Sequence, residues 1–284
     1  MKKLSFILII LFLSGTVFAD NAPQNVYSCR PAGTWRGEKF VFHPKPMNLR
    51  KFKYVNINIV DGDGKRSPSY AECVGKTVTV TDIDIQDEDN FTVRFRSDDG
   101  TLYEAVTNTG CIEGLIPLRD IENAREEFSG SKLWHLKENM LRYEEATDSY
   151  EPVYAPKYSS LTVVDVEPGW SNTTPVRFIL ENEYEQKGYV ELNLSGTNVP
   201  RSMRSRNRLW DNFSRDDPEK WDEMTKNYLE RHMIQPGMTS GQVQMSWGSP
   251  AKIEDLSGGR QKWIYPYGDC LYFKGGRLEK ISGE

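Results

Sequence analysis

The sequence VTVTDI at residues 78–83 returns as LTVVDV at residues 161–166, which is 83 positions further along the chain. Apolar and polar residues alternate in both stretches, and this period of two is typical of a β-strand with one buried face. The triplet VRF follows each stretch at the same interval, at residues 93–95 and 176–178. Because both blocks keep one offset without a gap, the chain is predicted to contain a duplicated β-module.

Each copy continues with further short strands separated by polar turns. A third strand is predicted near residues 102–107 in the first copy and 189–194 in the second. Such patterns indicate small antiparallel sheets or barrels, not parallel α/β units. Each copy resembles a bacterial SH3-like barrel. We therefore expect one SH3-like module over residues 20–120 and a second over residues 121–199.

An arginine-rich stretch follows the second copy. It has little apolar content and holds four arginines among Ser and Asn residues: Arg201, Arg204, Arg206 and Arg208. This composition is typical of a solvated connector, so we predict a linker over residues 200–216. The alternative is a basic patch that contacts an anionic membrane or partner.

The rest of the chain indicates two helices followed by a small sheet. Asp217 can cap a helix that runs to about His232. Thr239 and Gln242 form a capping box for a shorter second helix, which is predicted to end at Gly248. Short strands are predicted at residues 251–255, 261–267 and 270–273, and a Gly275-Gly276 turn leads into residues 277–281.

Four motifs in this segment resemble a known family. They are Gly237-Met238-Thr239, Trp247-Gly248-Ser249-Pro250, Gln261-Lys262-Trp263-Ile264-Tyr265 and Leu271-Tyr272-Phe273-Lys274-Gly275-Gly276-Arg277-Leu278. In this order they are similar to the SmpA/OmlA (BamE-like) family, in which a G-M-T turn starts a helix and a W-x-Y strand precedes a hairpin. The resemblance implies a C-terminal α+β module, a helix-helix-three-stranded-sheet domain over residues 217–284. Together with the duplicated β-modules, this makes the chain a mainly β protein by expectation.

The same resemblance implies an interaction module of the bacterial cell envelope that has no enzymatic activity. The apolar residues of the motifs are expected to form the core under the sheet: Met238, Val243, Trp247, Trp263, Tyr265, Leu271, Phe273 and Leu278.

Residues 1–19 are predicted to be a cleavable signal peptide. Two lysines precede an almost wholly apolar run at residues 4–13, and Ala19 ends a cleavage motif of compact residues. The first cysteine, Cys29, lies well beyond this motif, so a lipid anchor is not expected. We expect the protein to be exported to the bacterial periplasm or exterior, soluble after cleavage and without a membrane span.

Charge and cysteine content limit the class of protein further. The formal net charge is −5 at pH 7, whereas general nucleic-acid binders are usually basic, so we expect no nucleic-acid partner. The four cysteines are Cys29, Cys73, Cys111 and Cys270. In an exported chain one disulfide among the first three is expected, with its pairing open, while the wide spacing argues against a zinc site.

One stretch of the first copy has the spacing of a metal-binding loop. Asp61, Asp63 and Glu72 have the spacing of an EF-hand calcium loop, but Lys65 replaces an oxygen ligand and Arg66 replaces the required glycine. A polar hairpin loop is predicted there instead.

The chain has three histidines, and none lies beside a cysteine or in a nucleophile elbow. The pairs Glu144-Glu145 and Asp98-Asp99 could act as acid and base, but adjacent carboxylates usually face solvent. We expect no enzyme, no cofactor and no metal site.

Aromatic residues of the second copy could form a binding surface. Those we expect to contact a protein partner or a glycan are Trp134, Tyr154, Tyr158 and Trp170, although aromatic residues in strands more often belong to the core. The leading hypothesis is a non-enzymatic exported cell-envelope interaction protein that binds protein partners. The alternative is a glycan- or peptidoglycan-binding protein that uses aromatic surfaces of the SH3-like modules.

Overall fold

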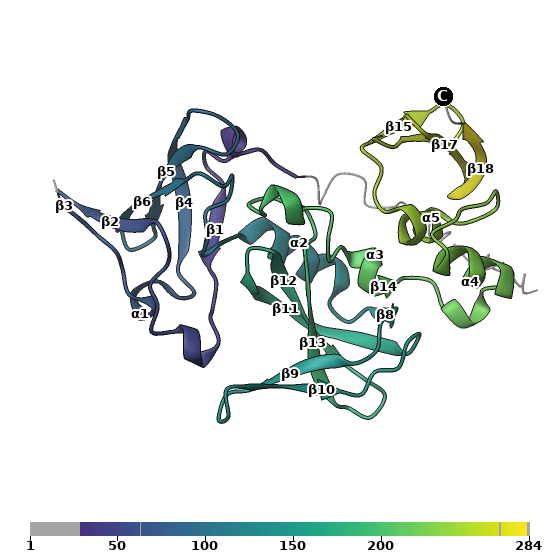
Figure 1. Cartoon of the computed structure of the whole chain (residues 1–284), viewed down its shortest axis with the longest axis horizontal. Helices are drawn as coiled ribbons and strands as arrows, with labels where there is room; N and C mark the ends of the chain where they lie inside the picture. The colour runs from purple at the N-terminus through teal and green to yellow at the C-terminus, as the bar shows by residue number, and fades with distance from the viewer. Residues whose placement is uncertain (1–28, 63, 267, 283–284) are drawn as a thin grey trace, which may run out of the picture.

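The computed structural model describes residues 29–62, 64–266 and 268–282, so the predicted signal peptide at residues 1–19 lies outside the described residues. Within these ranges the strands form two seven-stranded sheets and one four-stranded sheet, all antiparallel, in three consecutive modules (Figure 1). The prediction of a mainly β protein with antiparallel sheets is confirmed. No helix of the described residues has the length and apolar character needed to cross a membrane.

The first module holds the first sheet, with strand order β3-β2-β6-β5-β4-β1-β7. Its strands are β1 (Lys39–Phe42), β2 (Ile57–Asp61), β3 (Gly64–Arg66), β4 (Thr77–Ile85), β5 (Phe91–Ser97), β6 (Leu102–Thr107) and β7 (Leu115–Pro117). Three short helices lie outside the sheet: η1 (Ala32–Thr34), η2 (Met47–Leu49) and α1 (Tyr70–Cys73). The predicted polar hairpin loop joins β2 to β3.

The second module repeats this topology with strand order β10-β9-β13-β12-β11-β8-β14. Its strands are β8 (Lys132–His135), β9 (Met140–Glu144), β10 (Ser149–Val153), β11 (Ser160–Ser171), β12 (Thr174–Glu181), β13 (Lys187–Leu192) and β14 (Phe213–Ser214). Each strand of the first sheet thus has a counterpart seven strands later, as the duplicated sequence predicts.

The two copies differ in register. Each has a β-bulge at the equivalent place, between Val80 and Asp82 in the first copy and between Val163 and Asp165 in the second. Beyond the bulge, Asp82 lies opposite Arg94, whereas Asp165 lies opposite Ile179 and not opposite the equivalent arginine. The duplicated sequence therefore keeps the strand order but not every cross-strand pair.

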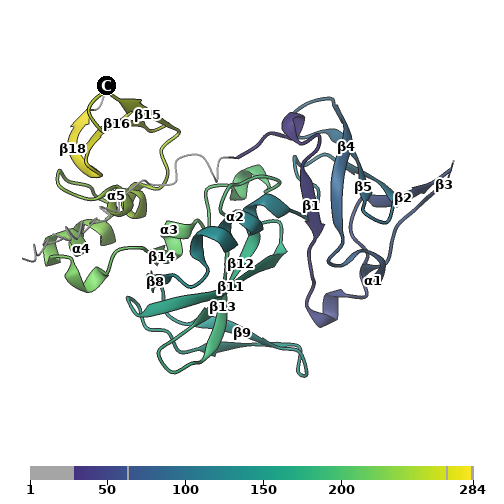
Figure 2. The same ribbon diagram turned by 180° about the vertical axis from the view of Figure 1, so that it is seen from behind.

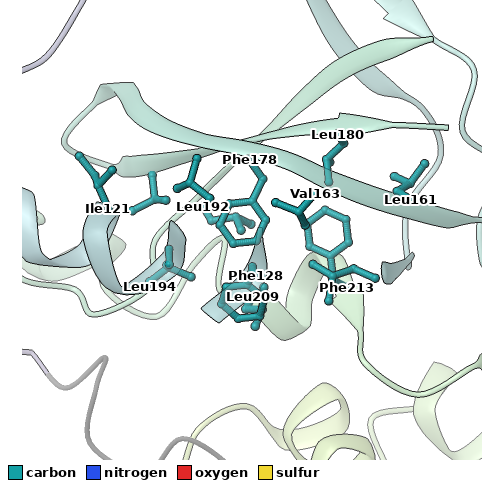
Figure 3. Packing of buried hydrophobic residues seen from close by; sticks show 14 of the residues in the cluster. Ile121, Phe128, Leu161, Val163, Phe178, Leu180, Leu192, Leu194, Leu209 and Phe213 are labelled. Atoms are coloured by element: carbon teal, nitrogen blue, oxygen red, sulfur yellow. The ribbon is translucent and has the colours of Figure 1, made fainter. Parts of the chain in front are cut away.

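Helix α2 (Leu118–Phe128) crosses the predicted boundary at residue 120. Its buried residues Ile121, Ala124 and Phe128 recur on one face of the helix and belong to the core of the second module. Figure 3 shows Phe128 below the strands that carry Phe178. The second module therefore begins with α2, directly after β7.

The segment predicted as a linker, residues 200–216, is folded. It contains η3 (Arg201–Met203), α3 (Leu209–Asn212) and β14, which pairs with β8. Leu209 and Phe213 are buried in the second core (Figure 3). The arginines dominate the composition of the segment. The two apolar residues that follow them complete the core of the second module and hold the segment against the sheet.

The third module begins with two separate helical segments in place of the single predicted helix. Asp217 caps η4 (Pro218–Lys220), Trp221 is extended, and the side chain of Asp222 accepts from the Thr225 amide at 2.7 Å to start α4 (Glu223–Glu230). Because Asp217 and Asp222 each start a helical segment, the single apolar face predicted for residues 217–232 is interrupted after Lys220.

The second predicted helix is α5 (Ser240–Trp247), with the Thr239 and Gln242 capping box in place. The sheet has four strands, one more than the three-stranded sheet that we predicted: β15 (Lys252–Leu256), β16 (Arg260–Ile264), β17 (Cys270–Lys274) and β18 (Arg277–Ser282). The predicted core is buried except for Trp247, which packs partly buried against it. In both views this module lies on the side of α3 and β14, away from the β2–β3 hairpin (Figures 1 and 2).

The four cysteines are free thiols, so the expected disulfide is not present in the structure. Cys73 is buried in the first core. Cys111 donates to the Asn198 carbonyl at 3.1 Å, and Cys29 donates to the Gly196 carbonyl at 3.4 Å. Cys29, Cys73 and Cys111 therefore lie in three different environments.

Candidate functional site

Three of the four aromatic residues predicted as contacts lie in one depression of the second module. It has a volume of about 650 Å³, and we call it the aromatic groove. Residues that define it are Trp134, Tyr154, Lys157, Tyr158, Glu183 and Tyr184. The fourth predicted residue, Trp170, lines a different pocket. The structure thus brings Trp134, Tyr154 and Tyr158 together and separates Trp170 from them.

Strand β8 directs Trp134 into the aromatic groove. Its neighbours Leu133 and His135 are 1% exposed, and side chains of successive strand residues point to opposite faces. Trp134 therefore lies on the outer face, where it is half-buried opposite Ser160 of β11.

The loop between β10 and β11 supplies two tyrosines. Tyr158 has a φ of 71°, a left-handed conformation that is uncommon for an aromatic residue. Its amide donates to the His135 carbonyl at 2.6 Å, and this bond fixes the loop to β8. The Tyr158 ring meets Trp221 edge-on at 6.4 Å, so the third module forms part of the groove wall.

The two most exposed rings of the groove come from the β10–β11 loop, which carries Tyr154, and from the β12–β13 turn, which carries Tyr184. Tyr154 and Tyr184 are 58% and 61% exposed, with ring centroids 6.4 Å apart. The Asn182 amide donates to the Tyr154 carbonyl at 2.9 Å and to Gln186 Oε1 at 3.0 Å, and its oxygen accepts from the Tyr184 amide at 3.0 Å. The turn is therefore fixed by its own hydrogen bonds before any ligand binds. Sequence reasoning missed Tyr184 because it lies in a polar turn.

The groove carries an excess of carboxylates. Four acidic residues line it, Glu181, Glu183, Asp217 and Glu219, against two lysines, Lys132 and Lys157. The Lys157 ammonium lies 4.8 Å from the centre of the Tyr158 ring and 3.7 Å from Glu230, and its pKa is raised, first by its interaction with Tyr158. The groove therefore has a negative electrostatic character.

Trp170 lines a second depression of about 480 Å³, which we call the inter-module pocket. Residues that define it are Pro46, Leu49, His135, Tyr150, Trp170 and Asn212. The Arg177 guanidinium lies between two rings, 3.8 Å from the centre of Trp170 and 4.0 Å from that of Tyr189, and pairs with Glu191 at 2.6 Å. Burial raises the pKa of Tyr189 to about 12. One face of Trp170 is thus covered by a cation of its own sheet.

The first module contributes Pro46 and Leu49 to the lining of the inter-module pocket, and neighbouring residues join the two modules. The Met47 amide of η2 donates to the Tyr143 hydroxyl at 2.8 Å, and Arg50 pairs with Glu145 at 2.5 Å. Glu145, one of the adjacent carboxylates of the Glu144-Glu145 pair, is therefore an exposed ion-pair partner of Arg50.

Asp99 and His43 also have structural surroundings. Lys76 and further hydrogen bonds hold the pKa of Asp99 well below its usual range. His43 is 5% exposed, and burial lowers its pKa. Within the described ranges, no three His, Cys, Asp or Glu side chains gather as metal ligands would.

Compared with models of protein families, with curated proteins and with solved structures, the chain matches none. Its geometry defines a mainly β protein with an open aromatic groove on the second of three modules.

Proposed function

We propose that the protein is a non-enzymatic interaction protein of the bacterial cell envelope, and that the aromatic groove binds an extended segment of a protein partner. The observation that carries this proposal is the convergence of Trp134, Tyr154 and Tyr158 with Tyr184 in one groove. Aromatic residues in a groove supply apolar contact area with little loss of side-chain entropy, which is why they are frequent in peptide-binding sites.

The charge of the groove supports a cationic segment. Four carboxylates outnumber two lysines along the lining, so basic side chains of a partner would find complementary charge. An extended peptide with basic residues next to proline or apolar residues fits both features.

Glycan binding is the alternative function for the groove. The open rings of Tyr154 and Tyr184 could pack against a sugar, but the Asn182 amide is already used within its turn. The remaining polar groups of the lining are mostly charged, which favours a charged ligand. The aromatic groove therefore supports the peptide function better.

The test is binding of fluorescent extended peptides that carry Lys or Arg, proline and apolar residues, with acidic peptides of the same length as a comparison. We expect saturable binding of basic peptides that weakens with added salt and falls at least about tenfold in Trp134→Ala and Tyr184→Ala. The matched control is Tyr150→Ala, because Tyr150 is 50% exposed but lies outside the groove.

Equal binding by Trp134→Ala, Tyr184→Ala and Tyr150→Ala would contradict the peptide function. Co-sedimentation with purified cell wall, lost in Trp134→Ala, would instead support the glycan alternative. The envelope location rests on the predicted signal peptide and on the BamE-like motifs, and fractionation of the producing cell with N-terminal sequencing of the mature chain tests it.

A further inference from the structure

The second module already holds one arginine of its own between two aromatic rings, in what we call the internal arginine site. The Arg177 guanidinium carbon lies 3.8 Å from the centre of the Trp170 ring and 4.0 Å from that of Tyr189. The two ring centres are 6.1 Å apart, and the ring planes make an angle of 51°. The guanidinium also pairs with the Glu191 carboxylate at 2.6 Å. Two tilted rings and one carboxylate therefore complete a site for an arginine side chain.

A second ring pair, in the aromatic groove, has nearly the same geometry and is open to solvent. The ring centres of Tyr154 and Tyr184 are 6.4 Å apart, and the ring planes make an angle of 46°. The two residues are 58% and 61% exposed, whereas Tyr189 of the internal arginine site is 7% exposed. No Lys or Arg of the described residues lies over either ring of the open pair. The open pair thus has the spacing and tilt of the internal site without its cation.

A carboxylate lies beside the open pair, as Glu191 does in the internal site. Glu183 lines the groove, and its charge, together with a hydrogen bond, raises the pKa of Tyr184. The neighbouring Glu181 is compensated by Lys187 at 3.9 Å. Among the ion pairs of the part of the chain that the structure describes, none includes Glu183. Glu183 can therefore pair with a cation from another molecule.

The fold itself does not require these rings. In the first copy the β5–β6 turn takes the place of the β12–β13 turn, and its residues 98–101 include no aromatic residue. Asp99 of that turn pairs with Lys76 of its own module at 2.7 Å. The second copy thus has open rings where the first copy has an internal ion pair. Exposed tyrosines that the fold does not need are typical of binding surfaces.

We propose that Tyr154, Tyr184 and Glu183 bind the guanidinium group of an arginine in the partner segment, in the way that the internal site binds its own arginine. This inference rests on the proposed peptide function and deepens it, because it names the side chain that the groove selects. Arginine is favoured over lysine, since a planar guanidinium can stack on a ring while it pairs with a carboxylate. An ammonium group does not make both contacts equally well.

The test compares three fluorescent peptides on the full chain. Each consists of proline and apolar residues with one variable position, which holds arginine, lysine or citrulline. Citrulline keeps the planar shape of arginine but has no charge. We expect the arginine peptide to bind about tenfold more tightly than the citrulline peptide and about threefold more tightly than the lysine peptide.

Four variants assign this preference to the open pair and its carboxylate. Glu183→Gln and Tyr184→Leu should each reduce the preference for arginine over citrulline at least about threefold. Tyr184→Phe keeps the ring and should keep the preference. The matched charge control is Glu219→Gln, because Glu219 lines the same groove but comes from η4 of the third module. It should keep the preference as well.

Equal binding of the arginine and citrulline peptides, still lost in Trp134→Ala, would overturn this inference and leave the peptide function standing. Tighter binding of the lysine peptide would overturn it too. The same holds for an unchanged preference in Glu183→Gln, or for an equal loss in Glu219→Gln. Absence of binding by all three peptides would contradict both the peptide function and the arginine site.

Discussion

The Asn172 side chain donates a hydrogen bond to the main-chain oxygen of Asn198 at 3.1 Å, and the two amide groups together hold the loop before β7. Both donate to the carbonyls of Ile112 and Leu115. The side-chain oxygen of Asn198, Oδ1, accepts from the Ile112 amide at 2.7 Å. These buried contacts join the first module to the second.

Removal of the Asn198 amide group should weaken the contact between the first and second modules and lower the free energy of unfolding. Asn198→Ala leaves a buried N–H and two carbonyls without this partner, so we expect the free energy of unfolding to fall by about 2–4 kcal/mol. Urea unfolding measures the loss, and hydrogen exchange should be faster at the Ile112 amide. Asn90→Ala is the control, since Asn90 is exposed in the turn between β4 and β5, and its cost should stay below about 1 kcal/mol. Equal costs for the two variants would contradict the role of Asn198.

Asp120 should make stability depend on pH. It accepts from the Ser195 hydroxyl at 2.6 Å inside the protein, and burial raises its pKa to about 6 from 3.8. Because the folded pKa lies above the unfolded value, this group contributes stability that is present below pH 3.8 and is lost as the pH rises through 6. The loss is at most about 3 kcal/mol.

Asp120→Asn isolates this contribution. The wild-type protein should lose more unfolding free energy between pH 4.5 and pH 7 than Asp120→Asn does, as measured by urea titration of both proteins. The expected advantage of the variant is greatest at pH 7 and small at pH 4.5. Parallel pH profiles of the two proteins would show that Asp120 does not titrate in this range.

Replacement of Arg177 by lysine should destabilise the second module. Its planar guanidinium is stacked between Trp170 and Tyr189 while it pairs with Glu191, and an ammonium group cannot reproduce both contacts. We expect Arg177→Lys to cost about 1–2 kcal/mol and Arg177→Ala about 3 kcal/mol, because the latter leaves a half-buried carboxylate uncompensated. A double-mutant cycle with Glu191→Ala, followed by unfolding and tryptophan fluorescence, should give a coupling energy above about 1 kcal/mol. Additive costs would rule out the coupling.

Phe213 should control access to the arginine-rich segment. Its ring is 2% exposed and is stacked 6.3 Å from that of Phe178, so Phe213→Ala should destabilise the second module by about 3–4 kcal/mol. Trypsin should then cut after Arg208 much faster than in the wild-type protein. Met224→Ala, which removes a side chain that is 60% exposed, should leave the cleavage rate unchanged. Rapid cleavage after Arg208 in the unaltered protein would mean that this segment is not held by β14.

The sequence predicts those features that depend on local patterns. The duplicated alternation at residues 78–83 and 161–166 predicts two related sheets because the side-chain period of a strand is visible in a few residues. The capping box at Thr239 is equally local, since its hydrogen bonds span three residues.

Features that depend on distant contacts were not predicted. Leu209 and Phe213 are buried in the core of the second module, and Phe213 pairs with His135 of β8, far upstream. No local pattern among the arginines indicates this burial. Trp170 is separated from the other predicted contact residues because it stacks on Arg177, and the choice of that partner is set by the register of β11 and β12.

Helix α2 follows β7 of the first sheet without a break and supplies three residues to the core of the second. The boundary of the repeated sequence is thus not the boundary of a self-sufficient folding unit. A gene fragment that encodes the second repeat alone must start at or before residue 118, or its product will expose the surface that Ile121 and Phe128 cover. Recombination between related genes would preserve folding only where the crossover falls upstream of this helix.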